Sequence, residues 1–111
     1  MKIAWLYLLL AGICEIGWAI GLKYSNGFSR LWPSIITVAV MIISFLLLSK
    51  ALRELPVGTA YAIWTGIGAA GTAVLGIIIF NEPKDLLRIG CILLIIIGVL
   101  GLKFLAGEVE Q

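Results

Sequence analysis

Histidine is absent from this chain, and cysteine and charged residues are scarce. Without histidine there is no imidazole metal ligand, no histidine proton relay and no Ser-His-Asp triad. The two cysteines, Cys14 and Cys91, lie in apolar runs without histidine or neighbouring cysteine ligands, so we expect neither a metal site nor a disulfide framework. A net charge of +2 scattered over 111 residues is too small for binding nucleic acid. We expect no enzyme, because no nucleophile and base pair is present, and no cofactor.

Apolar residues, in contrast, are abundant. Of the residues, 62% are hydrophobic and 13% charged, and the mean hydropathy is +1.17, more apolar surface than a soluble domain of this size could cover. The charges fall in clusters and leave four apolar runs, each near the length that crosses a bilayer. The sequence predicts one all-α integral membrane domain over residues 1–111, with four transmembrane helices at about 3–22, 31–49, 57–80 and 86–102.

The connections between these runs are short and have suitable turn residues. Asn26 and Gly27 form a turn signal after the first run, and Asp85 is a plausible N-cap for the fourth. No connection is long enough to hold a soluble domain. The chemistry of the chain is therefore expected inside the membrane.

Glu15 is the only charged residue between Ile3 and Leu22. That run makes about 30 Å of helix, so Glu15 would lie close to the bilayer midplane. Inserting a charged residue there costs about 2.5 to 3.5 kcal/mol. An acidic residue retained at that cost indicates a functional site. Its role could be ion coupling, a proton relay, or a counter-ion to a cationic substrate.

A few polar and aromatic side chains could assist Glu15. Trp18 lies one turn further on the same helix face, where it offers an aromatic wall for a cation. In the third span, Tyr61 and Trp64 share a face, and each has a polar tip that needs a partner when buried. Ser44 is a lone hydroxyl in the second span; on its own it is a weak signal, because a membrane serine commonly bonds to its own helix backbone.

Glycines in three of the spans suggest close helix packing or hinges. Gly12 lies one turn before Glu15, and Gly66 and Gly68 directly follow the aromatic pair of the third span. In the fourth span, Gly90 and Gly98 lie on one face and would form a groove for another helix.

Lysine and arginine divide evenly between the two sides of such a four-helix protein. The positive-inside rule then gives almost no preferred orientation, which favours dual topology. The alternative is that one loop carries more weight and fixes a single orientation. Four short helices cannot enclose a site, so we expect two copies in opposite orientation, related by a two-fold axis in the membrane plane. One side carries Lys2, Lys50, Arg53 and Lys103, and the other carries Lys23, Arg30, Lys84 and Arg88.

The chain resembles the small multidrug resistance family over essentially its whole length. The resemblance is carried by residues 11–15, 56–64 and 90–99. It implies a dual-topology, antiparallel homodimer in the plasma (inner) membrane that exports cations, driven by the proton gradient. Within the family the chain is similar to the guanidinium-exporter branch, on residues 18–28, 64–68 and 101–103.

The resemblance also implies roles for the candidate residues. Glu15 would bind substrate and protons alternately, and Trp18, Ser44, Tyr61 and Trp64 would form the hydrogen-bond network that holds it. Guanidinium is planar, and its N–H fork matches a carboxylate bidentately. Competition between a proton and a cation for one carboxylate is the simplest arrangement that allows their exchange.

Three other functions fit parts of this pattern. One is a multidrug exporter of bulky quaternary ammonium ions, which Trp18 and a tightly hydrogen-bonded site disfavour. Another is one subunit of a paired heteromeric transporter, which the even charge count disfavours. The last is a small pore-forming or holin-like protein, which would have no need for Glu15 with aromatic partners.

Overall fold

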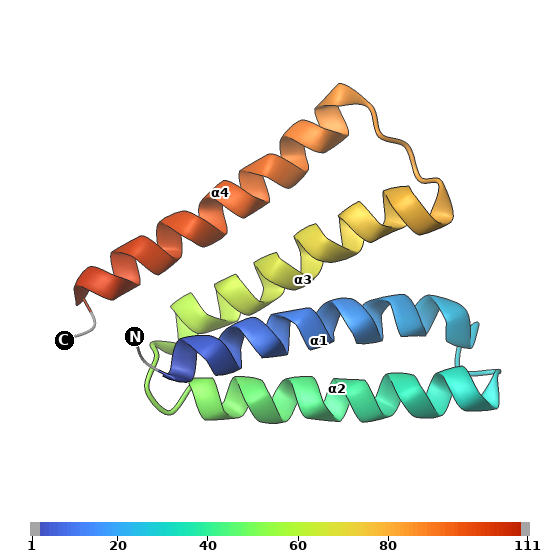
Figure 1. Cartoon of the computed structure of the whole chain (residues 1–111), viewed down its shortest axis with the longest axis horizontal. Coiled ribbons are helices and arrows are strands. Elements are labelled where there is room, and N and C mark those ends of the chain that lie inside the picture. The colour runs from blue at the N-terminus through green and yellow to red at the C-terminus, as the bar shows by residue number, and fades with distance from the viewer. Residues whose placement is uncertain (1–2, 110–111) are drawn as a thin grey trace.

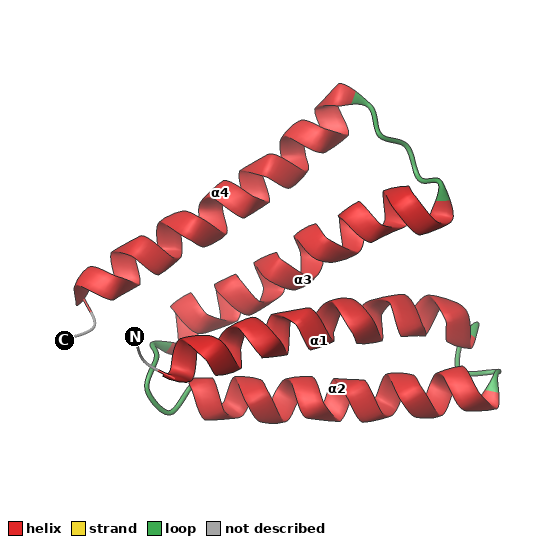
Figure 2. Cartoon of the chain, in the orientation of Figure 1, coloured by secondary structure: helices red, strands yellow, loops and turns green. Residues whose placement is uncertain are grey.

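A computed structural model describes residues 3–109, which form four α-helices and no strand (Figures 1 and 2). Each helix is long and apolar enough to cross a membrane. The expectation of an all-helical chain with four membrane spans is therefore confirmed, and the chain is a multi-pass membrane protein. Lys2 of the charge count, and the last two residues of the acidic tail, lie outside the described residues. The helices are α1 (Ile3–Ser25), α2 (Leu31–Ala51), α3 (Val57–Phe80) and α4 (Leu86–Val109).

Three helices continue beyond the apolar runs that predict them. α1, α2 and α4 each carry a lysine past the expected end of the span, at Lys23, Lys50 and Lys103. A long lysine side chain can keep its charge at the membrane surface while its backbone remains helical. For this reason the end of an apolar run does not mark the end of the helix.

These three lysines each lie over an aromatic ring of a different helix. The ammonium of Lys23 is 5.7 Å from the ring centre of Phe80, and that of Lys50 is 5.6 Å from Tyr7. Lys103 in α4 lies 4.7 Å from the ring centre of Trp5 in α1. Cation–π contacts thus join helix ends at both ends of the bundle.

The turns between helices follow the sequence signals. Asn26, Gly27 and Phe28 all have positive φ angles, of 50°, 71° and 66°, so the first connection is a left-handed turn. The hydroxyl of Ser25 accepts a hydrogen bond from the Phe28 N–H at 3.1 Å and holds this turn. Asp85 accepts the backbone N–H of Arg88 at 3.3 Å, which confirms it as the N-cap of α4.

From top to bottom in Figure 1 the helices lie in the order α4, α3, α1, α2. The backbone of α1 packs against both α2 and α3, whereas the backbone of α4 packs against α3 alone. Large apolar side chains remain exposed along α4, including Leu86 (84%), Leu87 (82%) and Phe104 (78%). In a membrane such surface meets lipid or another helix. α1 is the central helix of the chain, and its two packed faces position the site.

Candidate functional site

Glu15 lies on the face of α1 that packs against α3. Oε1 of its carboxyl group is buried, and no hydrogen-bond partner for it exists within residues 3–109. Gly68 of α3 lies directly against this group, because a Cβ atom at Gly68 would overlap the carboxyl carbon and Oε1. A buried carboxyl oxygen without a partner is unfavourable. A proton or a small cation would satisfy it.

The carboxyl group opens into a groove of about 410 Å³ between α1 and α3. The α3 side of this groove is made mostly of small residues, spaced so that they share one helix face. Its other charged side chains are Lys23, at the end of α1, and Glu82, in the connection after α3. The full lining is Glu15, Ala19, Ile20, Lys23, Thr65, Gly68, Ala69, Thr72, Ala73, Gly76, Phe80 and Glu82.

A second polar cluster joins three helices one turn before Glu15. Ser44 of α2 donates its hydroxyl to the carbonyl oxygen of Ala11 in α1 at 2.8 Å. Trp64 of α3 donates its indole N–H to the same carbonyl at 3.2 Å and to the Ser44 hydroxyl oxygen at 3.1 Å. Ser44 therefore bonds across helices rather than to its own backbone. Because Ala11 lies four residues before Glu15, this cluster fixes the helical turn that carries the carboxyl group.

Aromatic rings extend from this cluster. Tyr61 packs on Trp64 with ring centres 5.6 Å apart, and Trp64 packs on Phe45 at 5.7 Å. Phe45 in turn meets Trp18 at 6.3 Å in an edge-on arrangement. The sequence analysis missed Phe45, because a phenylalanine in an apolar span has no compositional signal. Its position next to Ser44 is the only hint.

The structure thus divides the expected site residues into two groups. Ser44, Tyr61, Trp64 and Trp18 are joined through hydrogen bonds and ring contacts. The Glu15 carboxyl group faces Gly68 instead, and within residues 3–109 its buried oxygen has no bond to any of the four. The indole N–H of Trp18 is likewise buried without a partner in this part of the chain. The shared element is α1, which carries both Glu15 and the Ala11 carbonyl.

The glycines expected to pack or hinge also divide into two groups. A Cβ at Gly12 would lie 2.7 Å from an isoleucine methyl of α3, so Gly12 allows α1 and α3 to approach. Gly66 likewise admits a side chain of α4, from Val99. Gly68, which faces Glu15, belongs with these two. The other group is Gly90 and Gly98, where a Cβ atom would meet nothing within 4 Å beyond the adjacent backbone of its own helix.

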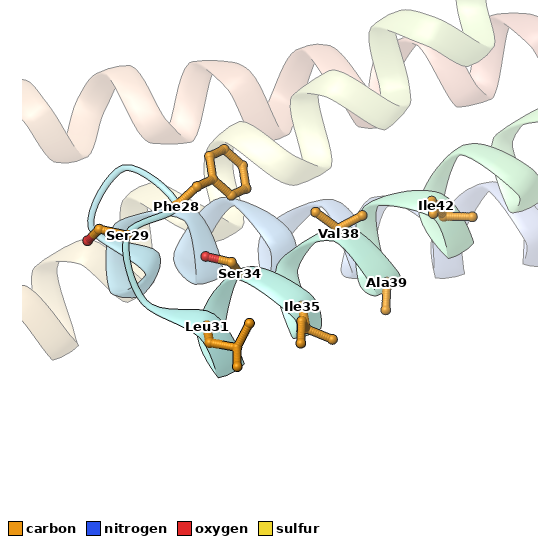
Figure 3. Close-up of a pocket in the computed structure, with 8 residues that line it drawn as sticks. All are labelled: Phe28, Ser29, Leu31, Ser34, Ile35, Val38, Ala39 and Ile42. Carbon is orange, nitrogen blue, oxygen red and sulfur yellow. The ribbon is translucent and has the colours of Figure 1, made fainter.

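Another hollow on the described part of the chain is larger than the groove between α1 and α3. It has a volume of about 590 Å³ and lies on the outer face of α2 and the turn before it (Figure 3). No charged side chain lines it, so it offers no counter-charge for a cation. Within residues 3–109 there is also no group of three or more acidic, cysteine or histidine side chains that could hold a metal ion.

Comparisons with known proteins show which family and which relatives the chain is similar to. The model of the family described as small multidrug resistance protein matches residues 3–96. The chain is 53% identical to a protein of Escherichia coli (strain K12) named guanidinium exporter, over 90% of this chain and 95% of that protein. Proteins with the same name from Proteus vulgaris and Yersinia pestis are 55% and 58% identical, each over 90% of this chain and 96% of their own length.

Proposed function

The chain belongs to the small multidrug resistance family, and from this membership we propose that it exports guanidinium and small guanidinyl cations in exchange for protons. Support for the substrate comes from relatives at 53% to 58% identity that are named guanidinium exporters. These names also favour transport over catalysis. The membrane is the plasma (inner) membrane, where a proton gradient is available to drive export.

The observation that carries this proposal is the buried, unpartnered carboxyl oxygen of Glu15 beside the backbone of Gly68. A planar guanidinium ion can present two parallel N–H groups to one carboxylate. The small side chains of the neighbouring groove leave room for an ion of that size. A proton on the same carboxyl group removes its charge, so substrate and proton exclude each other.

The other candidate residues have supporting roles in this proposal. Ser44 and Trp64 hold the Ala11 carbonyl, and with it the orientation of the helical turn that ends at Glu15. Trp18, on the same helix as Glu15, supplies an aromatic wall for a cation and excludes bulky ones, and Tyr61 joins the network through its contact with Trp64. In the assembled dimer we expect all four side chains to contact the substrate or Glu15 directly.

The transporter in this proposal is an antiparallel homodimer. Its support is the open face of α4, where Gly90 and Gly98 leave room for a helix from another chain. The exposed apolar side chains of the same helix are compatible with contact to lipid or to that second chain. The even division of basic residues between the two sides allows both orientations to insert.

The test is guanidinium uptake into proteoliposomes with an imposed pH gradient. We expect saturable uptake driven by the gradient, little transport of a bulky quaternary ammonium ion, and loss of uptake in Glu15→Gln. Preference for the quaternary ammonium ion would identify a multidrug exporter instead. Uptake that neither saturates nor depends on the proton gradient would identify a pore. Activity seen only with a second, different chain would identify a heteromeric transporter.

A further inference from the structure

We propose that Glu82 and the ring of Phe80 form an outer cation-binding position, which a guanidinium-type cation occupies before it reaches Glu15. The inference rests on the proposed function, because it adds a step to the same path. It assigns a role to two residues of the groove lining that the proposed function does not use. The path is the α1–α3 groove, and the outer position lies at the end of α3.

The groove connects the two carboxylates. Glu15, Phe80 and Glu82 all line it, and Phe80 is the last residue of α3. From Gly68, which faces Glu15, to Phe80 the helix rises about 18 Å. Along this length the α3 wall consists of alanine, glycine and threonine residues, which leave space for a small planar ion. The groove therefore extends from Glu82 to Glu15, with Lys23 as the cationic side chain of its lining.

Backbone geometry holds Glu82 at the groove. Asn81 ends α3 in a left-handed conformation with a φ of 55°, which turns the chain back toward the helix. The backbone N–H of Glu82 then donates to the carbonyl of Gly76 at 3.2 Å. The carboxylate lies over Gly76, where a Cβ atom would be only 2.7 Å from Oε1. The side chain is thus placed by a glycine and a helix cap, unlike an ordinary loop glutamate.

The Phe80 ring already binds a cation in this structure. The ammonium of Lys23 lies 5.7 Å from the ring centre, and Tyr24 packs against the same ring at 5.5 Å. An aromatic face that accepts an ammonium also accepts a guanidinium, which is more weakly hydrated. An arriving substrate would displace Lys23 from the ring while the Glu82 carboxylate supplies the opposite charge.

The neighbouring carboxylate, Asp85, is already used. It pairs with the guanidinium group of Arg88 at 3.4 Å and caps α4 through the Arg88 N–H. It does not line the groove. Asp85→Asn removes the same charge from the same connection and keeps a good N-cap residue. It is therefore a matched control for Glu82→Gln.

The experiment compares guanidinium transport by wild type, Glu82→Gln and Asp85→Asn in proteoliposomes. We expect Glu82→Gln to raise the half-saturating guanidinium concentration about twofold to fivefold, the range for a partly exposed charge. Its maximal rate should not change, because Glu15 is intact. Asp85→Asn should match wild type in both parameters. Equal increases in the two variants would indicate a general surface-charge effect and overturn the proposal.

A second pair of variants separates position from charge. Gly76→Ala leaves Glu82 in the chain but pushes its carboxylate away, so it should raise the half-saturating concentration in the same direction. Gly58→Ala, in the same helix with open space around it, is the control and should have no effect. If wild type transports guanidinium and Glu82→Gln is indistinguishable from it, the outer position is wrong and the proposed function stands. If wild type does not transport guanidinium, the proposed function itself fails.

Discussion

Gly68 of α3 presents its backbone to the carboxyl group of Glu15 in α1, so closely that no side chain fits between them. The carboxylate therefore owes its position to the absence of a Cβ atom on the facing helix. This contact places the proposed binding group at the inner end of the α1–α3 groove.

Gly68→Ala should displace the Glu15 side chain. The new methyl group would push the carboxyl group out of its position, and because a misplaced binding group loses activity we expect guanidinium transport to fall roughly tenfold or more. The measurement is initial uptake in proteoliposomes at fixed protein content. Gly58→Ala serves as the matched control. Full activity of Gly68→Ala would show that the carboxylate does not need this position.

Guanidinium binding should weaken as the pH falls through the range in which Glu15 takes up a proton, because the neutral acid no longer attracts a cation. For one-to-one competition the apparent Kd rises about tenfold per pH unit below that range. Equilibrium binding to the purified transporter across alkaline to mildly acidic pH measures this. An affinity that stays constant over that interval would mean that protons act at another group.

Ser44→Ala should weaken the three-helix cluster. The change removes the donor to the Ala11 carbonyl and the acceptor for the Trp64 indole N–H, although Trp64 keeps its own bond to Ala11. Hydrogen bonds between membrane helices contribute about 0.6 to 1.7 kcal/mol, so we expect a loss of folding stability in that range. Ser34→Ala is the control on the same helix, because the hydroxyl of Ser34 makes only an exposed hydrogen bond to the backbone carbonyl of Arg30, four residues earlier. Equal stability losses in both variants would contradict a special role for Ser44.

Gly98→Leu should weaken self-association without disturbing the protomer. No atom of the described chain lies near this glycine, so a leucine side chain meets only the surface proposed to receive another chain. Cross-linking yield in native membranes should fall while helical content by circular dichroism remains constant. An unchanged cross-linking yield would place the dimer interface elsewhere.

Adding two lysines to the second loop, between α2 and α3, should trap the chain in one orientation. The reason is that the basic residues are otherwise balanced between the two sides. If function needs opposed copies, this variant should be inactive alone. It should regain activity when co-expressed with a variant that carries two lysines in the first loop. Activity of the first variant by itself, with its orientation established by cysteine labelling, would show that a parallel assembly is sufficient.

Much of the fold follows from the sequence because the bilayer imposes a length on each apolar run. The four helices and the cap at Asp85 can be predicted in this way. Glu15 is equally evident, since a carboxylate in an apolar span is rare and unfavourable. Side chains that are ordinary for their surroundings cannot be found by this reasoning, and Phe45 is the example within a span.

Glu82 illustrates a second limit of the sequence. In the chain it reads as a solvated loop carboxylate between Asn81 and a proline. Its place over Gly76 depends on the left-handed residue before it and on one backbone hydrogen bond. The contact between Gly76 and Glu82 depends on the chain turning back on the end of α3. Neither the hydropathy nor the charge pattern of the sequence reveals such a turn.

The three lysines that lie over aromatic rings also determine how the protein responds to lipid. They link α1 to α3 at one membrane surface and α1 to α2 and α4 at the other. Each such contact contributes about 0.5 to 1 kcal/mol, whereas a mismatch in hydrophobic thickness costs only fractions of a kcal/mol per ångström. Over an ångström or two of mismatch the three links together exceed that cost, so they oppose sliding of the helices past one another. We therefore expect a bilayer of shorter lipid chains to be accommodated mainly by tilting of the bundle as a unit.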